Sequence, residues 1–229
     1  MHLGNHRGIN TANLSSYGDG KSVGNTKNVF FDTETTGWVP GQVGQLAFIV
    51  ENQGKIELAK NYFFTVKEMT QGAQDAHHMS KEFLAEQSGG MVFKDVGQEI
   101  HQVFKEGRLV AHNLNFDERF LSAELWRLEI PFSALERQCT MEFFKNVVKI
   151  PNKNPKYKSF KNPKLAEVVD AFRIDPEMVM KYSVNLFGAG NISFHDARFD
   201  TTAMYVATNI YREMSNSRET EWQKVFCKK

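Results

Sequence analysis

Two acidic residues lie at the end of a predicted buried strand, where an ionised carboxylate loses its hydration. Asp32 and Glu34 end the segment 29–34 (VFFDTE), whose aromatic and β-branched residues are typical of a buried strand. Side chains alternate faces along a strand, so both acids point to one face, about 7 Å apart. Buried carboxylates need a proton or a cation. We therefore expect a cation-binding site at the C-terminal end of this strand.

Two further acids lie on or near apolar helix stripes. Asp117 is near the start of a predicted helix over 115–128, and Asp200 lies in the apolar face of a predicted helix over 197–214. His195 is five residues before Asp200, an offset that would turn the two apart on one continuous helix. His195 and Asp200 can face one site only if His195 lies in the loop before the helix.

The four acids predict a metal site if they converge. Each pair of ionised carboxylates at about 4 Å repels by roughly 4 kcal/mol at an effective dielectric constant near 20. Oxygen ligands favour Mg²⁺ or Mn²⁺ over zinc. Two such ions about 3.5–4 Å apart are commonly used to cut phosphodiesters. We therefore expect two Mg²⁺ (or Mn²⁺) ions, with the ligands Asp32, Glu34, Asp117 and Asp200.

Three motifs resemble one enzyme family. They are FDTETTG at 31–37, HNLNFD at 112–117 and HDARFD at 195–200. In this order and with this internal spacing they are similar to the DEDDh branch of the DnaQ-like 3′→5′ exonucleases, which includes the proofreading subunit of bacterial DNA polymerase III. The resemblance covers about residues 28–214. It implies an α/β, ribonuclease H-like fold, with a mixed five-stranded sheet whose first three strands are antiparallel and which is flanked by helices.

The resemblance also implies residue roles. His195 would be the general base that takes a proton from the attacking water, and the four acids would hold the ions. The family's other branch has Tyr four residues before the last acid, where this chain has Asp196. Thr35 would touch the 3′-terminal nucleotide through its backbone, and Phe116 would pack against a base.

A histidine segment gives a less exact match. Residues 75–84 are similar to the family's His-Gly-Ile-Ser/Thr segment, which lines the terminal nucleotide. We match His78 to the histidine of that pattern, although Met79 then stands where the pattern has glycine. A structural role for His78 remains an alternative.

The expected function is metal-dependent release of 5′-mononucleotides from the 3′ end of DNA, with single-stranded or frayed ends favoured. One alternative is an RNA-trimming exoribonuclease similar to oligoribonuclease, because no motif reports recognition of the 2′-hydroxyl. An alternative of another class is a catalytically inactive nucleic-acid-binding or scaffolding module. The residues after 219 either contact a DNA polymerase or clamp or pack against their own domain, and their shortness favours packing.

Periodicity predicts the remaining elements. Strands are expected at 45–50, 56–66, 109–111 and 137–140, and helices at 92–106, 115–128, 141–148, 164–172, 176–186 and 197–214. Residues 67–91 are expected to form a loop. The lysine-rich segment 151–164 is expected to be a loop that either grips phosphates or is simply solvated. We expect a flexible tail over 1–27, one exonuclease domain over 28–214 and a short tail over 215–229.

Composition limits the classes of function. The chain has 28 basic and 27 acidic residues and a formal net charge of +1, which argues against a protein that coats long duplexes. Cys139 and Cys227 are too few for a disulfide framework and fit a reducing cytoplasm. No apolar run is long enough to span a bilayer and the N-terminus lacks the pattern of a signal peptide, so we expect a cytoplasmic protein without a membrane partner.

Overall fold

The fold is built on a mixed sheet. The computed structural model describes residues 26–154, 156, 159–188, 194–214 and 221–228. The sheet has five strands in the order β3-β2-β1-β4-β5. Their bounds are β1 Lys27–Thr35, β2 Val43–Asn52, β3 Lys55–Phe63, β4 Gly107–Ala111 and β5 Glu136–Cys139. The first three strands pair antiparallel, and β4 and β5 add on in parallel, which confirms the predicted sheet.

Strand β1 is central because both of its faces are apolar. Val29 and Phe31 pack into one core, and Phe30 packs into another on the opposite face. Each of these three side chains is completely buried. A strand buried on both faces can only lie in the interior of a sheet.

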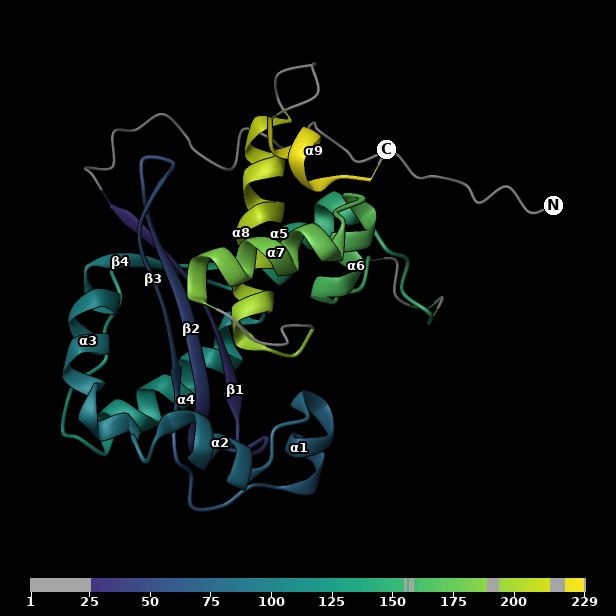
Figure 1. The fold of residues 1–229 in the computed structure, drawn as a ribbon. Coiled ribbons are helices and arrows are strands. Elements are labelled where there is room, and N and C mark those ends of the chain that lie inside the picture. The colour runs from purple at the N-terminus through teal and green to yellow at the C-terminus, as the bar shows by residue number, and fades with distance from the viewer. Residues whose placement is uncertain (1–25, 155, 157–158, 189–193, 215–220, 229) are drawn as a thin grey trace.

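Helices cover both faces of the sheet (Figure 1). One core joins the sheet to α3 (Gly97–Lys105) and α4 (Leu114–Trp126), next to the 3-10 turn η2 (Phe93–Asp95). The other joins it to α5 (Thr140–Val148), α6 (Leu165–Ala171), α7 (Pro176–Phe187) and α8 (Ala197–Glu213). These bounds agree closely with the predicted helices. Side chains of β1 that point to the α8 face therefore meet the residues of that helix.

The β2–β3 connection is a tight hairpin. Asn52 pairs with Lys55, which leaves Gln53 and Gly54 as a two-residue turn. Both turn residues have positive φ, 51° and 79°, the combination that a hairpin turn of this kind requires.

The segment 67–91 is not a loop throughout, and that prediction is wrong. It contains α1 (Gln71–His77) and α2 (Lys81–Ser88). The side chain of Thr70 caps the first helix and that of Ser80 caps the second, each accepting a hydrogen bond from a backbone N–H. Because each helix is short and buries few apolar side chains, hydrophobic periodicity gives almost no signal here.

The end of the chain packs on its own domain. Helix α9 (Glu221–Phe226) places Trp222 at 5.5 Å from Tyr205, measured between ring centroids, and Phe226 is buried. The backbone N–H of Asp175 donates to the carbonyl of Phe226 over 2.6 Å. The predicted tail over 1–27 lies almost wholly outside the described residues, and β1 begins at Lys27.

Within the described residues, no helix has the length and apolar character needed to cross a bilayer.

Candidate active site

Three carboxylates meet at one end of the sheet. Carboxylate oxygens of Asp32, Glu34 and Asp200 all lie within 4.8 Å of one another. The first two acids come from the last residues of β1, on the face that packs against α8, as strand alternation predicts. The third lies in the first turns of α8, whose N-terminal end is at the same end of the molecule as the end of β1 (Figure 1). Two elements more than 150 residues apart thus build the cluster.

Asp117 joins this region from the opposite face of the sheet. It lies in the first turn of α4 and is only 3 % exposed. Its Oδ1 accepts hydrogen bonds from the backbone N–H of Thr33 over 3.0 Å and from the Thr33 hydroxyl over 2.7 Å. Thr33 stands between Asp32 and Glu34, so these bonds tie the fourth acid to the strand that carries the first two.

The electrostatics of the site are those of crowded acids. Burial raises the pKa of Asp117 and of Asp200 to about 7. Burial also raises the pKa of Asp32 and Glu34 well above the ordinary value, and repulsion from Asp117 and Asp200 raises both further. The four groups therefore act on one another electrostatically, and without cations they hold protons near neutral pH.

The residues fit divalent cations. The Oδ1 atom of Asp200 is buried and has no hydrogen-bond partner in the described part of the chain. A buried acceptor without a partner costs about 1–3 kcal/mol, which a coordinated cation would remove. The donor set consists of carboxylate oxygens, which suit hard cations. The cluster thus has the charge, the ligand type and the free oxygen of a metal centre.

Raising the pH is expected to destabilise the metal-free protein. The carboxyl pKa values are raised in the folded state, so the folded protein binds more protons than the unfolded chain, and stability falls as the pH rises through about 7. We expect the Tm without metal to fall between about pH 5.5 and 8, by about 2–4 °C for each kcal/mol lost. Mn²⁺ should restore it at the higher pH. Thermal unfolding in EDTA and in Mn²⁺ measures both effects, and a metal-free Tm that rises over this range would contradict the assignment.

His195 stands in the loop before α8, as the offset from Asp200 requires. Helix α8 begins at Ala197, with Asp196 as its N-cap. His195 is exposed, and its backbone has a φ of 65°, in the left-handed region. The backbone N–H of His195 donates to Oδ2 of Asp200 over 3.3 Å. The imidazole is thus attached at the edge of the acidic cluster and open to solvent.

The histidine that contacts the β1 end is His77 and not His78. The Nδ1 atom of His77 accepts from the N–H of Met79 over 3.1 Å, so the proton is on Nε2, which donates to the carbonyl of Thr35 over 3.2 Å. Burial lowers the pKa of His77, which keeps the ring neutral. His78 is exposed, with a φ of 61° that favours glycine.

The structure aligns the family's histidine pattern with this chain one residue earlier than the sequence analysis did. The family pattern His-Gly-Ile-Ser/Thr fits His77-His78-Met79-Ser80, with His78 at the left-handed glycine position and Ser80 as the helix cap. The signal that could have revealed this was the Ser80 cap, which fixes the register of the pattern.

A half-buried and an exposed aromatic ring lie together near the β1 end. Phe116 of α4 lies edge-to-face with Trp38, with ring centroids 6.1 Å apart, and Trp38 is 80 % exposed. The turn that carries Trp38 is held to the end of α4, where Nη2 of Arg127 donates to the Gly41 carbonyl over 2.6 Å. Sequence reasoning selected Phe116 and missed Trp38, whose signal was a large aromatic residue directly after Gly37.

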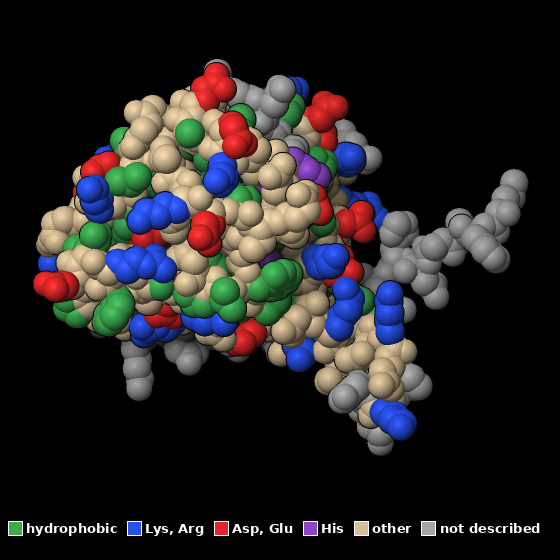
Figure 2. All heavy atoms as spheres, turned by 90° about the horizontal axis from the view of Figure 1, so that it is seen from below, with side chains coloured by type: hydrophobic (Ala, Val, Ile, Leu, Met, Phe, Trp, Pro, Cys, Tyr) green, Lys and Arg blue, Asp and Glu red, His purple; other side chains and the backbone are tan. Residues whose placement is uncertain are grey.

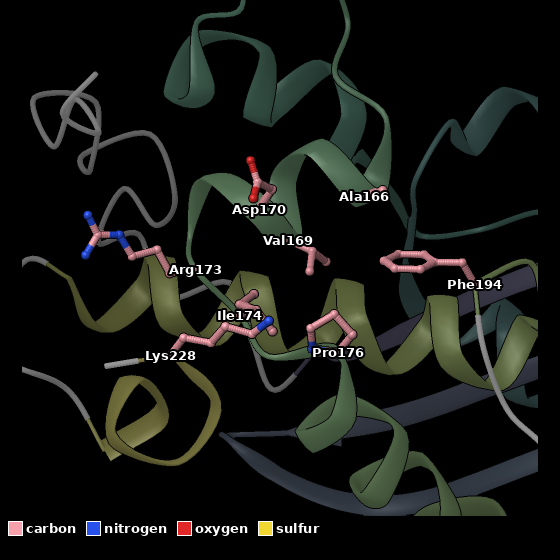
Figure 3. A pocket seen from close by; sticks show the side chains of 8 residues that line it. All are labelled: Ala166, Val169, Asp170, Arg173, Ile174, Pro176, Phe194 and Lys228. Carbon is pink, nitrogen blue, oxygen red and sulfur yellow. The ribbon is translucent and has the colours of Figure 1, made fainter. Parts of the chain in front are cut away.

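The surface at this end has mixed charge. Figure 2 looks onto the end that carries α1 and α2, and Lys and Arg side chains are spread over it between acidic ones. A separate pocket of about 470 Å³ is lined by charged residues, among them Asp170, Arg173 and Lys228, and by apolar ones. Figure 3 shows the side chains that line it. Phe194, the residue before His195, lines it, whereas the clustered acids do not.

The fold and the acidic cluster define a nuclease domain of the DnaQ-like class. The chain belongs to the RNase_T exonuclease family, because a sequence model of that family matches residues 29–203.

Similar proteins agree with this family. The chain is 31 % identical over 117 residues to the DNA polymerase III subunit epsilon of Rickettsia prowazekii, a match covering 48 % of this chain and 50 % of that protein. It is 29 % identical over 104 residues to the subunit epsilon of Rickettsia felis, covering 43 % of this chain and 44 % of that protein. The matched regions thus span about half the length of these relatives.

Solved structures share the fold. Exonuclease X in complex with 5′ overhanging duplex DNA superposes with a TM-score of 0.54 at 16 % identity, covering 82 % of this chain and 93 % of that one. Exonuclease I of E. coli in complex with a dA16 oligonucleotide superposes with a TM-score of 0.61 at 14 % identity, covering 83 % of this chain and 42 % of that one. At these identities the likeness concerns the fold.

Proposed function

We propose that the chain is a metal-dependent 3′→5′ exonuclease of the DEDDh type, which releases 5′-mononucleotides from the 3′ end of DNA. The observation that carries the proposal is the meeting of Asp32, Glu34 and Asp200 oxygens within 4.8 Å, in the fold of an exonuclease family. These three residues, with Asp117, would hold two Mg²⁺ or Mn²⁺ ions. Bound ions would activate a water molecule and offset the charge of the scissile phosphate.

The proton of the attacking water goes to His195. The imidazole is exposed beside the acidic cluster, and its backbone is bonded to Asp200. A base in this place can accept a proton from a water at the cluster without being a ligand itself. This role requires the neutral form of His195.

The terminal nucleotide is proposed to lie against Thr35. His77 fixes the carbonyl of Thr35 through its Nε2–H, so we assign to His77 the role that the sequence had suggested for His78. The ring of Phe116 and the exposed ring of Trp38 offer faces on which bases can stack, an interaction worth about 1–3 kcal/mol per base.

DNA is the favoured substrate because the relatives are named as subunits of a DNA polymerase and two of the matched structures hold DNA. The names of these relatives also support a finer proposal, namely that this chain contacts a DNA polymerase. Because α9 uses Trp222 and Phe226 to pack against its own domain, we do not assign that contact to this helix.

The proposal is tested with 5′-labelled oligonucleotides in Mn²⁺, Mg²⁺ or EDTA. We expect shortening from the 3′ end only with metal. Single-stranded and mismatched ends should react about tenfold faster than paired ends, because each terminal step costs about 1.4 kcal/mol to unpair. Faster digestion of an RNA oligomer of matched sequence would favour the exoribonuclease alternative. Tight strand binding without any shortening would favour an inactive binding module.

Replacing His77 is expected to slow the enzyme, whereas replacing His78 is not. His77→Ala removes a hydrogen bond to a buried carbonyl, worth about 1–3 kcal/mol, and should lower kcat/KM by roughly tenfold. His78→Gly at the exposed left-handed position should leave kcat/KM within about twofold. Steady-state kinetics on a single-stranded oligonucleotide measure both, and the reverse order of effects would return the role to His78.

A further inference from the structure

A fifth carboxylate lies close to the acidic cluster but is fully occupied by other groups. Asp196 accepts hydrogen bonds from the N–H of Arg198 over 3.0 Å and from its Nε over 2.9 Å, and its second oxygen accepts from Nη2 over 2.7 Å. Both residues are 7 % exposed. Repulsion from Asp196 raises the pKa of Asp32, Glu34 and Asp200, which reflects how near it lies. The Arg198 guanidinium therefore compensates an acid that would otherwise add to the cluster.

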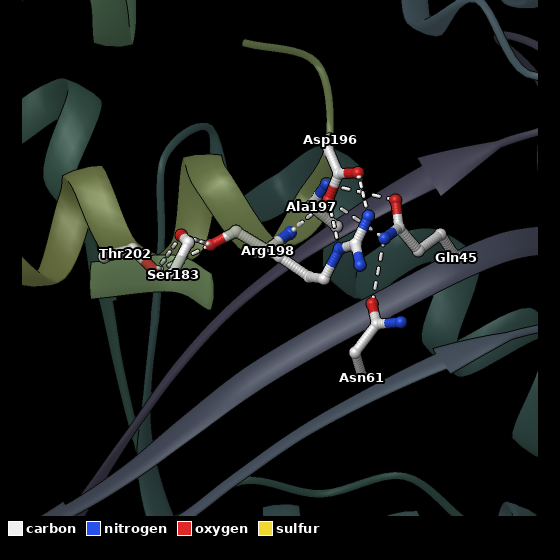
Figure 4. Close-up of polar contacts among 7 residues, drawn as sticks. All are labelled: Gln45, Asn61, Ser183, Asp196, Ala197, Arg198 and Thr202. Atoms are coloured by element: carbon white, nitrogen blue, oxygen red, sulfur yellow. Dashed lines mark hydrogen bonds and ion pairs between the residues drawn. The ribbon is translucent and has the colours of Figure 1, made fainter. Parts of the chain in front are cut away.

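Gln45 connects this ion pair to the sheet. Its Oε1 accepts from the N–H of Ala197 over 3.1 Å, and its Nε2 donates to Asp196 over 3.1 Å and to Asn61 over 2.9 Å (Figure 4). Gln45 is completely buried, and its amide can satisfy these partners in one orientation only. It is also the cross-strand partner of Glu34. The start of α8 is thus bonded to the strand beside the metal-ligand candidates.

Arg198 is itself fixed on its other sides. Its guanidinium lies 5.3 Å from the ring centroid of Phe63. Its carbonyl accepts from the hydroxyl of Ser183 over 3.0 Å and from that of Thr202 over 2.7 Å (Figure 4). The first turn of α8 therefore has little freedom to rotate against β2 and α7.

His195 stands between two anchored neighbours. Asp196 follows it, and Phe194 before it packs on Phe199 with ring centroids 4.5 Å apart. A left-handed backbone costs a residue other than glycine about 1–2 kcal/mol, so surrounding contacts must hold it there. The contacts of Phe194 and Asp196 on either side of His195, together with its own backbone bond to Asp200, are in a position to do so.

We propose that Asp196, Arg198 and Gln45 form a positioning lock, which fixes the backbone of His195 so that its imidazole meets the attacking water. This inference rests on the proposed function and deepens it, because it gives a role to Asp196 and Arg198, two residues of the third motif that are not metal-ligand candidates, and to Gln45, which lies outside all three motifs. Arg198 and Gln45 act through His195 and are positioning residues. Loss of the lock should lower kcat and leave the ligands of the ions in place.

The test is a double-mutant cycle between Arg198→Leu and His195→Ala. In the presence of His195, Arg198→Leu should lower kcat on a single-stranded oligonucleotide by about 10- to 100-fold, the range expected for a base displaced by about 1 Å. KM should stay within about twofold, a margin typical of a site left intact. The Kd for Mn²⁺ should not rise, because the uncompensated Asp196 adds negative charge beside the ligand candidates. In the His195→Ala background, the same substitution should change kcat by less than about twofold, since no base remains to be displaced.

Arg198→Lys is the second variant, because it keeps the charge if Arg198→Leu does not fold. Lysine cannot form the two-pronged contact of arginine with Asp196. Arg198→Lys should therefore lower kcat when His195 is present and leave kcat unchanged in the His195→Ala background. Arg108→Leu is a control at a more exposed ion pair, because Arg108 of β4 pairs with Glu136 of β5, and it should leave kcat unchanged.

The outcomes separate the two proposals. Equal losses in both backgrounds, or a matching loss of Mn²⁺ affinity, would overturn the lock and leave the exonuclease assignment standing. A wild-type rate in His195→Ala would overturn both the role of His195 and the lock. A wild-type protein without metal-dependent shortening would overturn the proposed function itself.

Discussion

Replacing Asp32 by Asn is expected to remove nuclease activity and to stabilise the metal-free protein. The carboxylate shares the cluster with Glu34 and Asp200, so the amide removes a ligand at its centre. Losing several kcal/mol of metal-assisted stabilisation corresponds to a fall in kcat/KM of about 10³-fold or more. The Tm in EDTA near pH 8 should rise, because one of the mutually repelling buried charges is gone.

The control for this prediction is Asp170→Asn, the same chemical change at an exposed carboxylate. It should leave both activity and Tm unchanged. The measurements are oligonucleotide digestion, Mn²⁺ titration and thermal unfolding. An Asp32→Asn protein that degrades a 3′ end at the wild-type rate would refute the metal-centre assignment.

Removing the imidazole of His195 is expected to lower kcat by roughly 10²–10⁴-fold and to spare metal binding. The side chain is exposed and its bond to Asp200 comes from the backbone, so the His195→Ala protein retains that bond and the carboxylates. A general base contributes to the chemical step and little to ground-state binding, so KM should change less than kcat. Single-turnover digestion and Mn²⁺ titration separate the two quantities.

His78→Ala is the matched control, because His78 is also exposed and has a φ of 61° against 65° for His195. Any effect of placing Ala at a left-handed position should appear in both variants. A fall in the Mn²⁺ affinity of His195→Ala equal to its fall in kcat would contradict the role of base.

Much of the fold could be predicted because its long elements are strongly periodic. The helix over 197–214 and the strand at 29–34 were placed within two residues of their observed ends. Helices α1 and α2 were missed because they are short and polar, and their capping residues Thr70 and Ser80 were the usable signal. The positions of these two helices follow from their capping residues and not from a hydrophobic pattern.

The acids of the site could be predicted because a charge in an apolar stripe is conspicuous. The strand face shared by Asp32 and Glu34 follows from alternation alone. The assignment of His77 in place of His78 could be foreseen only from the Ser80 cap, since a left-handed backbone angle leaves little trace in one sequence. The contact of Gln45 with Asp196 joins residues 151 positions apart, a pairing that only the folded chain reveals.

The four acids reach the end of β1 from both sides of the sheet. Asp117 comes with α4 and one core, and Asp200 comes with α8 and the other. A nascent chain on the ribosome carries Asp32, Glu34 and Asp117 long before α8 has been synthesised. The cluster of Asp32, Glu34 and Asp200 oxygens is therefore complete only after the second layer docks, so we expect metal binding to be a late event of folding.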